Sequence, residues 1–209
     1  MFKFLAQEYV SQYGFLNLFN FITFRVGASI LTSLFFSLIF GQFIINKLSK
    51  IQPNGQPIRN DGPQTHIIKK AGTPTMGGVL IILSVFSASV LWSDLYNSFV
   101  WIGLLALISF GFIGIIDDYN KVKSNSSNGL KAITRIILQI VFSLIISLVI
   151  VKMLDDQIDT TISFPFFKNL IINFGSFYLL ISLFILVGSA NAVNLTDGLD
   201  GLAIVPVLI

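Results

Sequence analysis

The sequence predicts an all-α fold, a polytopic bundle of transmembrane helices, from three observations. The hydrophobic fraction is 54% and the mean hydropathy is +0.84. Charged residues make up only 11% of the chain, against about 25% in soluble domains. Those charges are separated by long uncharged runs. This composition excludes a disordered chain, which needs low hydrophobicity and high charge, and it argues strongly against a soluble domain.

The uncharged runs define the candidate membrane spans. A helix needs about 20 apolar residues to cross a hydrocarbon core of about 30 Å. Four runs reach that length, and a shorter fifth reaches it if Arg135 and Lys152 snorkel at its ends. None shows the alternation of barrel strands. We expect one membrane domain over residues 1–209, with spans at approximately 24–46, 73–93, 96–117, 133–152 and 174–195 and an incomplete sixth at 202–209.

The distribution of positive charge predicts the orientation. Nine of the thirteen Lys and Arg residues lie in or next to two of the connections, between spans 1 and 2 and between spans 3 and 4. The positive-inside rule places both connections in the cytoplasm and the N-terminus outside, which explains the net charge of +3 without a nucleic-acid partner. The expected cytoplasmic loops are 47–72, 118–132 and 196–201. A short hairpin is expected near residues 160–167, in an external loop.

Three polar stretches are expected on the cytoplasmic face. They are Lys69–Gly78 entering span 2, Asp117–Lys121 leaving span 3 and Asn191–Gly201 leaving span 5. Because spans 3 and 5 would end on the same surface, the three stretches are predicted to meet in one interfacial pocket.

Asp117 and Asp118 follow an uninterrupted apolar run. Adjacent carboxylates repel each other and burial raises the cost, so a positive partner is expected: Mg²⁺, a lysine or a cationic ligand. Neighbouring helical residues point about 100° apart, so one carboxylate would face the pocket and the other a supporting group. The alternative is a solvated helix end with Lys121 and Lys123 as counter-charges.

Asn191, Asn194 and Asp197 recur every three residues and would share a helical face. Such groups at membrane depth are costly unless they bind something. Gly198 and Gly201 would end the helix and let a ligand approach the backbone. The alternative is a hydrogen-bonded seam between helices, with the glycines as packing notches.

The stretch from Gly72 to Gly78 is not a Walker loop, because no Gly-Lys-Ser/Thr ends it. Its amides and hydroxyls suit an anion near a helix start, with Lys70 beside them. The alternative is a plain Pro/Gly helix entry. Together, carboxylates, amides, lysines and a Gly-rich loop at a lipid–water boundary fit a substrate with phosphates and an apolar tail. Phosphoryl transfer needs mainly positioning, charge neutralisation and Mg²⁺.

Residues 69–78, 114–122 and 191–203 closely resemble the bacterial phospho-N-acetylmuramoyl-pentapeptide transferases, as does Arg59-Asn-Asp-Gly-Pro63. The resemblance covers essentially the whole chain. It implies transfer of phospho-MurNAc-pentapeptide from UDP-MurNAc-pentapeptide to undecaprenyl phosphate, with Mg²⁺. The products would be lipid I, for peptidoglycan synthesis, and UMP. It further implies a multi-pass protein of the bacterial cytoplasmic (inner) membrane whose active site faces the cytoplasm.

The resemblance also implies residue roles. Asp117 would activate the lipid phosphate oxygen, as a base or by holding it for direct attack, and Asp118 would support it and the metal region. Lys121 would meet the pyrophosphate. The implied substrate-binding residues are Lys70, Lys121, Asn191, Asn194, Asp197, Gly198 and Asp200. Asp117 and Asp118 are the candidate metal ligands in this chain, and the main ligand is expected beyond Ile209.

The chain departs from this family in length, because it stops inside the expected sixth span. We therefore expect an N-terminal part of a longer enzyme that is inactive alone. One alternative is a related enzyme that moves a different sugar phosphate to a polyprenyl carrier. The other is a non-enzymatic transporter or channel subunit. The lipid bilayer is an expected partner, and a homodimer is kept as a hypothesis.

Overall fold

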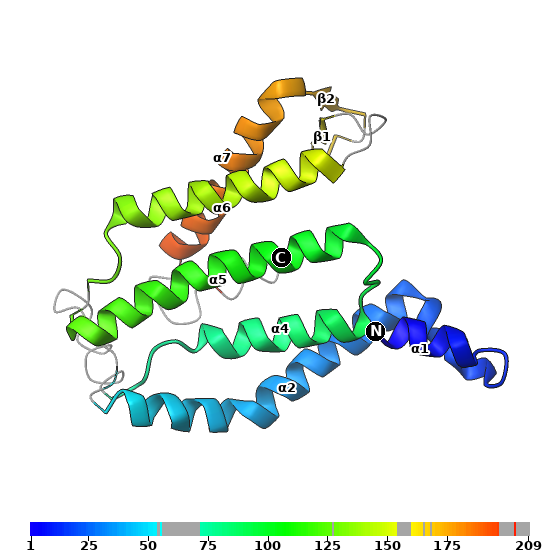
Figure 1. The fold of residues 1–209 in the computed structure, drawn as a ribbon, viewed down its shortest axis with the longest axis horizontal. Coiled ribbons are helices and arrows are strands. Elements are labelled where there is room, and N and C mark those ends of the chain that lie inside the picture. The colour runs from blue at the N-terminus through cyan, green and yellow to red at the C-terminus, as the bar shows by residue number, and fades with distance from the viewer. Residues whose placement is uncertain are drawn as a thin grey trace. The chain divides into compact units, whose positions relative to one another are not determined.

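A computed structural model describes residues 1–53, 55, 72–126, 128–153, 160–164, 166–167, 169–196 and 203. The fold is mostly helical, as predicted (Figure 1). The chain forms two compact units, Met1–Lys131 and Ala132–Ile209. The expected sixth span at 202–209 lies outside the described residues, except for Ala203.

The described residues of the first unit form five helical elements. In chain order they are α1 (Phe2–Tyr9), the 3-10 helix η1 (Gly14–Asn20), α2 (Ile22–Ile51), α4 (Gly78–Trp92) and α5 (Ser98–Ser124). The second unit contains α6 (Ala132–Met153), strands β1 (Thr161–Ser163) and β2 (Ile171–Asn173), the 3-10 helix η2 (Gly175–Phe177) and α7 (Tyr178–Thr196). Among the described residues, four helical segments are long and apolar enough to cross a membrane: α2, α5, α6 and the combined η2–α7 segment.

Helix α4 is shorter than the predicted span at 73–93, because residues 72–77 are not helical. Gly72 and Met76 have positive φ angles of 79° and 74°, and Pro74 lies between them. These conformations are incompatible with a right-handed helix. The 15 residues of α4 rise about 22 Å, less than a hydrocarbon core of about 30 Å.

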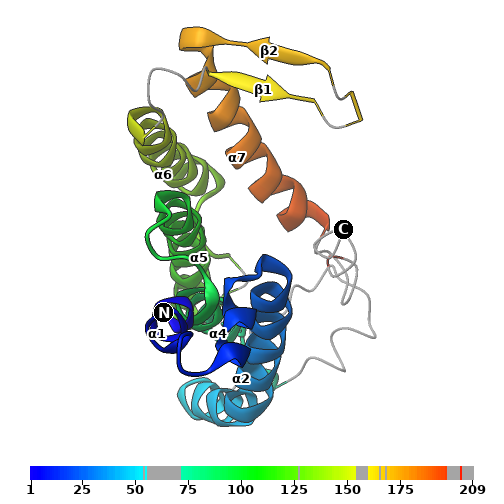
Figure 2. The same cartoon turned by 90° about the vertical axis from the view of Figure 1, so that its right-hand side faces the viewer.

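Helices α2, α4 and α5 lie side by side in both views of the first unit (Figures 1 and 2). Helix α4 runs antiparallel to α2 along its length. Three side-chain contacts follow the pair from one end to the other: Trp92 Nε1 to Thr32 Oγ1, Ser37 Oγ to Ser84 Oγ, and Thr75 N to Gln52 Oε1, each 2.9 Å. The C-terminal end of α2 and the loop that enters α4 therefore lie together at one end of the unit.

Helix α1 is attached at the opposite end of α4. Lys3 forms an ion pair with Asp94, the terminal amine of Met1 donates to the carbonyl oxygen of Val90 at 3.1 Å, and the ring of Phe2 lies 4.9 Å from that of Trp92. The N-terminal segment thus anchors the end of α4 that is remote from the loop at residues 72–77.

The distribution of side chains in the first unit is the reverse of that in a soluble protein. On α2, Phe35, Leu38 and Ile39 are 58%, 68% and 68% exposed, whereas Ser84 and Ser109 between the helices are 2% and 5% exposed. Small polar residues at helix contacts and large apolar residues facing outward are typical of helices surrounded by lipid. The packing thus supports the membrane assignment independently of composition.

The second unit follows the predicted boundaries closely. Helix α6 matches the span expected at 133–152, and the η2–α7 segment matches that at 174–195. The expected short hairpin is present, with its second strand later than residues 160–167: β1 and β2 pair antiparallel, with Ile162 opposite Ile172, and Figure 2 shows them beyond the start of α7. Helices α6 and α7 pack against each other.

Candidate functional site

Asp117 and Asp118 lie on α5, which continues to Ser124 instead of ending at residue 117 as expected. The helix extends because Lys121 pairs with both carboxylates at the i+4 and i+3 spacings. Asn125 ends the helix in a left-handed conformation, with a φ of 45°, and its backbone N–H donates to the carbonyl oxygens of Lys121 and Val122. Both carboxylates are therefore carried by a regular helical turn.

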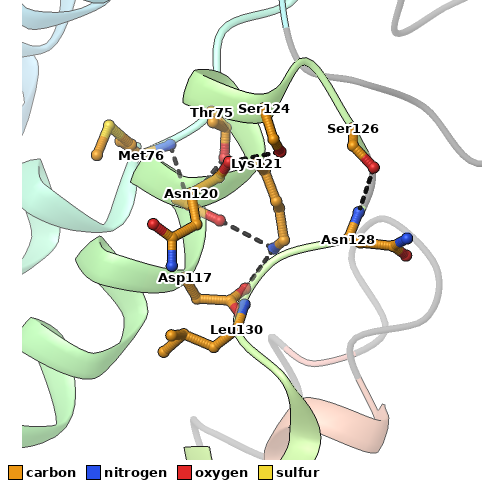
Figure 3. Close-up of polar contacts among 10 residues, drawn as sticks. Thr75, Met76, Asp117, Asn120, Lys121, Ser124, Ser126, Asn128 and Leu130 are labelled. Carbon is orange, nitrogen blue, oxygen red and sulfur yellow. Dashed lines mark hydrogen bonds and ion pairs between the residues drawn. The ribbon is translucent and has the colours of Figure 1, made fainter. Parts of the chain in front are cut away.

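The positive partner of the two aspartates is Lys121, a lysine as one of the expected partners and also the counter-charge named in the alternative of a solvated helix end (Figure 3). Its Nζ lies 2.6 Å from Asp117 Oδ2 and 3.0 Å from Asp118 Oδ1, so one ammonium group bridges the pair. The side chains of Asp117, Asp118 and Lys121 are 14%, 27% and 31% exposed. The cluster is thus partly desolvated, which strengthens the attraction, yet it remains open to water.

Asp118 is held by the loop that enters α4. Its Oδ2 accepts a hydrogen bond of 2.7 Å from Thr75 Oγ1 and one of 3.2 Å from the backbone N–H of Met76 (Figure 3). The sequence predicted that the amides and hydroxyls of this loop suit an anion near a helix start. In the structure the anion is the carboxylate of Asp118 on α5. It contacts the N–H of Met76, two residues before the start of α4, where the helix dipole favours negative charge.

Asp117 is held from another direction. Its Oδ1 accepts a hydrogen bond of 2.8 Å from the backbone N–H of Leu130, in the segment after α5. Gly129 beside it leaves room for this carboxylate: a Cβ there would lie 2.6 Å from Asp117 Cγ and 2.8 Å from Oδ2. The two neighbouring carboxylates thus have separate supports. The sequence predicts a supporting group for one of them and the pocket for the other, so the support of both carboxylates differs from that prediction.

The other predicted site residue with a clear environment is Asn191, on α7. Its Nδ2 donates to Gln139 Oε1 on α6 at 2.7 Å and to the carbonyl oxygen of Val187 at 2.8 Å. Ser182 on α7 likewise donates to Ser147 on α6 at 2.7 Å. These contacts form a hydrogen-bonded seam between two helices, which is the alternative to a ligand site for this stretch. A substrate-binding role for Asn191 stays a prediction.

The remaining predicted substrate-binding residues are less constrained. Asn194 is exposed on α7. Lys70, Asp197, Gly198 and Asp200 lie outside the described residues, so their roles also stay predictions. Among the described residues, no group of three or more His, Cys, Asp or Glu side chains is arranged to hold a metal ion.

Sequence reasoning missed four groups that hold the carboxylates. Thr75 and Met76 belong to the predicted anion-binding stretch Gly72–Gly78, but their contact with Asp118 joins residues far apart in the sequence. Leu130 contributes only a backbone amide and Gly129 only the absence of a side chain, so neither has a signature in a single sequence. What results is a pair of fixed, partly exposed carboxylates bridged by an ammonium group. Such a pair can accept a proton. It can also hold a cation, either the lysine ammonium group or a metal ion that is bound to phosphate.

The comparisons with known proteins bear on this same region. The family model described as glycosyl transferase family 4 matches residues 100–209, which is more than half of the chain and includes all of the acidic site on α5. The chain belongs to this family. A second model, phospho-N-acetylmuramoyl-pentapeptide-transferase signature 1, matches residues 70–82. This range contains the loop whose Thr75 and Met76 donate hydrogen bonds to Asp118.

Relatives within the family are similar over nearly the whole chain. A protein of Pelagibacter ubique (strain HTCC1062) is 47% identical over 205 residues, covering 98% of this chain and 56% of the relative. One of Rickettsia akari (strain Hartford) is 50% identical over 191 residues, covering 91% of this chain and 52% of the relative. Both are named phospho-N-acetylmuramoyl-pentapeptide-transferase. The chain spans about half the length of these curated relatives, and the resemblance expected from its motifs is confirmed.

Proposed function

We propose that the chain is part of an enzyme that transfers phospho-MurNAc-pentapeptide from UDP-MurNAc-pentapeptide to undecaprenyl phosphate, giving lipid I and UMP. The observation that carries this proposal is the bridged carboxylate pair at the end of an apolar helix, held by the loop that matches the transferase signature. A charged, preorganised cluster at a lipid–water boundary suits a reaction between a lipid phosphate and a water-soluble diphosphate.

The reaction needs a nucleophile and charge neutralisation. An oxygen of undecaprenyl phosphate attacks the phosphorus that carries the sugar, and the bond from that phosphorus to the bridging oxygen of UMP breaks. Asp117 removes the proton from the lipid phosphate or holds it for direct attack. Asp118 supports that carboxylate from a position fixed by Thr75 and Met76. Lys121, whose ammonium group bridges the two carboxylates, would neutralise negative charge on the pyrophosphate.

Mg²⁺ fits this site in ligand chemistry, because carboxylate oxygens are the donors that this hard cation prefers. Asp117 and Asp118 would hold it, and it would neutralise charge on the donor diphosphate. Since Mg²⁺ commonly uses one or two carboxylates together with substrate phosphates, a pair of aspartates is a sufficient contribution from this part of the protein.

A donor comparison tests the proposal. Membranes containing the full-length protein are supplied with undecaprenyl phosphate and either UDP-MurNAc-pentapeptide or UDP-GlcNAc, and UMP and the glycolipid product are measured. We expect UMP and lipid I with the muramoyl donor only, and none from residues 1–209 alone. Product from UDP-GlcNAc would instead support the alternative transferase, and robust release by residues 1–209 would contradict the view that this chain is an incomplete enzyme.

We also propose five membrane crossings, with the N-terminus outside the cell and the acidic site facing the cytoplasm of a bacterial inner membrane. The support is that α4 runs antiparallel to α2 along its length, so that α4 and the loop before it span the same distance. A transporter function is less well supported, because the two aspartates lie near the C-terminal end of α5 and not in its middle.

Cysteine labelling tests this orientation, since the chain has no cysteine of its own. Lys123→Cys near the end of α5 and Tyr96→Cys in the connection before α5 are introduced into a full-length protein without other cysteines. A membrane-impermeant maleimide is expected to label position 123 from the cytoplasmic side and position 96, where the side chain is 84% exposed, from the outside. Labelling of both from one side would contradict the proposed crossings.

A further inference from the structure

Gln52, directly after α2, is a polar side chain that is only 4% exposed. Buried amides are normally hydrogen-bonded, so its partners indicate its role. Its backbone N–H already closes the end of α2 by donating to the carbonyl oxygen of Leu48 at 2.9 Å. The side chain is therefore not needed for that cap and is free to act elsewhere.

The side chain binds the backbone of Thr75 at two points. Gln52 Oε1 accepts a hydrogen bond of 2.9 Å from the N–H of Thr75, and Gln52 Nε2 donates to its carbonyl oxygen at 3.4 Å. A two-point contact fixes both the position and the orientation of that residue. Thr75 in turn donates from its hydroxyl to Asp118. The end of α2 is thus connected to the Asp118 carboxylate by two successive sets of hydrogen bonds, from Gln52 to Thr75 and from Thr75 to Asp118.

The loop needs such support because its backbone is strained. Met76 has a φ of 74°, a conformation that costs a residue with a Cβ on the order of 1 kcal/mol or more and persists only where the surroundings impose it. The Met76 N–H donates to Asp118 from this conformation. Gly55, three residues after Gln52, lies against the start of the same loop: a Cβ there would come within 2.6 Å of the backbone carbon of Gly72.

We propose that Gln52 is a positioning residue for the transfer reaction, acting through Thr75 to hold the Asp118 carboxylate. The inference rests on the proposed function and adds a residue outside the acidic cluster. Gln52 touches neither carboxylate, so its loss leaves the charges of the site intact and alters only their placement. Misplaced catalytic groups lower the rate more than they weaken binding, and the effect belongs in kcat rather than in KM.

The test compares two glutamines of α2 and its C-terminal end in the full-length protein. Gln52→Leu removes both contacts with Thr75, and Gln52→Glu keeps an acceptor for the Thr75 N–H. Gln42→Leu is the matched control, because Gln42 is exposed and pairs only with Asn46 among the described contacts, at 2.9 Å. UMP release gives kcat and the KM for UDP-MurNAc-pentapeptide, and thermal unfolding in detergent reports folding.

We expect Gln52→Leu to lower kcat about tenfold with KM changed less than twofold, Gln52→Glu to recover part of that loss, and Gln42→Leu to match the wild type. Thr75→Val should lower kcat less in the Gln52→Leu background than in the wild type, because the two residues act in one chain of contacts. If Gln52→Leu does not fold, Gln52→Glu, Thr75→Val and the double variant Gln52→Glu with Thr75→Val carry the same test.

The outcomes separate the two proposals. Wild-type protein that releases no UMP would overturn the proposed function and this inference together. Normal wild-type release, with Gln52→Leu equal to Gln42→Leu in kcat, would overturn this inference alone. Additive effects of Gln52→Leu and Thr75→Val would do the same, because they would show that Gln52 does not act through Thr75.

Discussion

The acidic end of α5 and the seam between α6 and α7 are both polar clusters in apolar surroundings, but they are built from different groups. The first joins two carboxylates to an ammonium group, a loop hydroxyl and two backbone amides from three separate segments. The second joins neutral side chains of two helices, chiefly Gln139 to Asn191 and Ser147 to Ser182.

The difference teaches which cluster is suited to chemistry. In the seam, Gln139 and Ser147 are 5% and 0% exposed, and each finds its partner across the helix contact. Such contacts stabilise helix packing in membranes and leave little capacity for a ligand. In the acidic cluster, charges stay partly exposed and are held by elements remote in sequence. That cluster is preorganised for charge, and the seam is preorganised for packing.

Among the groups that support the two clusters, the largest effect is expected at Lys121. Lys121→Gln removes the bridging charge and leaves two adjacent carboxylates without their shared ammonium partner. We expect UMP release by the full-length protein to fall by at least about 100-fold, the size of effect seen when a preorganised charge is removed from a reaction centre. Lys123→Gln is the control, because Lys123 is exposed two residues away. Equal losses in the two variants would show that bulk positive charge matters and the bridge does not.

The next effect concerns the space around Asp117. Gly129→Ala places a Cβ 2.6 Å from Asp117 Cγ, so the carboxylate or the segment carrying Leu130 must shift. We expect kcat to fall roughly 10- to 100-fold with little change in the donor KM, since displacements near 1 Å are that costly. Gly103→Ala on α5 is the control, because nothing lies within 4 Å of its added Cβ. Full activity of Gly129→Ala would mean that the Asp117–Leu130 contact is dispensable.

A smaller effect, on stability, is expected in the seam. Asn191→Leu removes the donor to Gln139 and leaves a buried amide oxygen without that partner, at a cost of about 1–2 kcal/mol in unfolding free energy. Asn194→Leu, one turn later and exposed, should leave the unfolding temperature unchanged and raise the donor KM if the predicted substrate role holds. Thermal unfolding and UMP release measure both. A stable Asn191→Leu protein with a raised KM would place Asn191 in the binding site and not in the seam.

The smallest effect is expected far from both clusters, at the ion pair of Lys3 and Asp94. The hydrogen bond from Lys3 lowers the pKa of Asp94 below its ordinary value of 3.8. A lowered carboxyl pKa contributes stability above the ordinary value, and the contribution is lost as the pH falls through the pKa of the folded state. Asp94→Asn should cost less than about 1 kcal/mol at neutral pH, because the pair is partly exposed.

Unfolding measured from neutral pH down to about pH 3 checks this prediction, and the difference between Asp94→Asn and the wild type should shrink toward the acid end. A difference that is independent of pH would indicate that the contact of α1 with α4 depends on packing, for example of Phe2 against Trp92, and not on the charge.

Much of the fold follows from apolar run lengths, and its exceptions have local causes. The spans at 133–152 and 174–195 and the short hairpin agree with α6, α7 and the pair of β1 with β2. Helix α4 is shorter than its apolar run because Gly72, Pro74 and Met76 impose a bent loop. Helix α5 is longer than its run because Lys121 stabilises a charged turn that hydropathy alone does not predict.

The site was predictable in its charged members only. Adjacent aspartates after an apolar run required a positive partner, and Lys121 supplies it. Their other supports depend on tertiary contacts: Thr75 lies 43 positions from Asp118, and Leu130 contributes a backbone amide that every non-proline residue possesses. The three-residue spacing predicts that Asn191 and Asn194 share a helical face. It does not reveal that the Asn191 side chain donates a hydrogen bond to Gln139 on α6.

The most direct test of the acidic cluster as the reaction centre is UMP release by full-length Asp117→Asn, measured together with binding of UDP-MurNAc-pentapeptide. Asparagine keeps the size of the side chain and its capacity to accept from the Leu130 N–H, and it removes the charge and the basic oxygen. We expect release to fall by about 10²–10⁴-fold while donor binding stays within a fewfold of the wild type. Unchanged release would contradict the account.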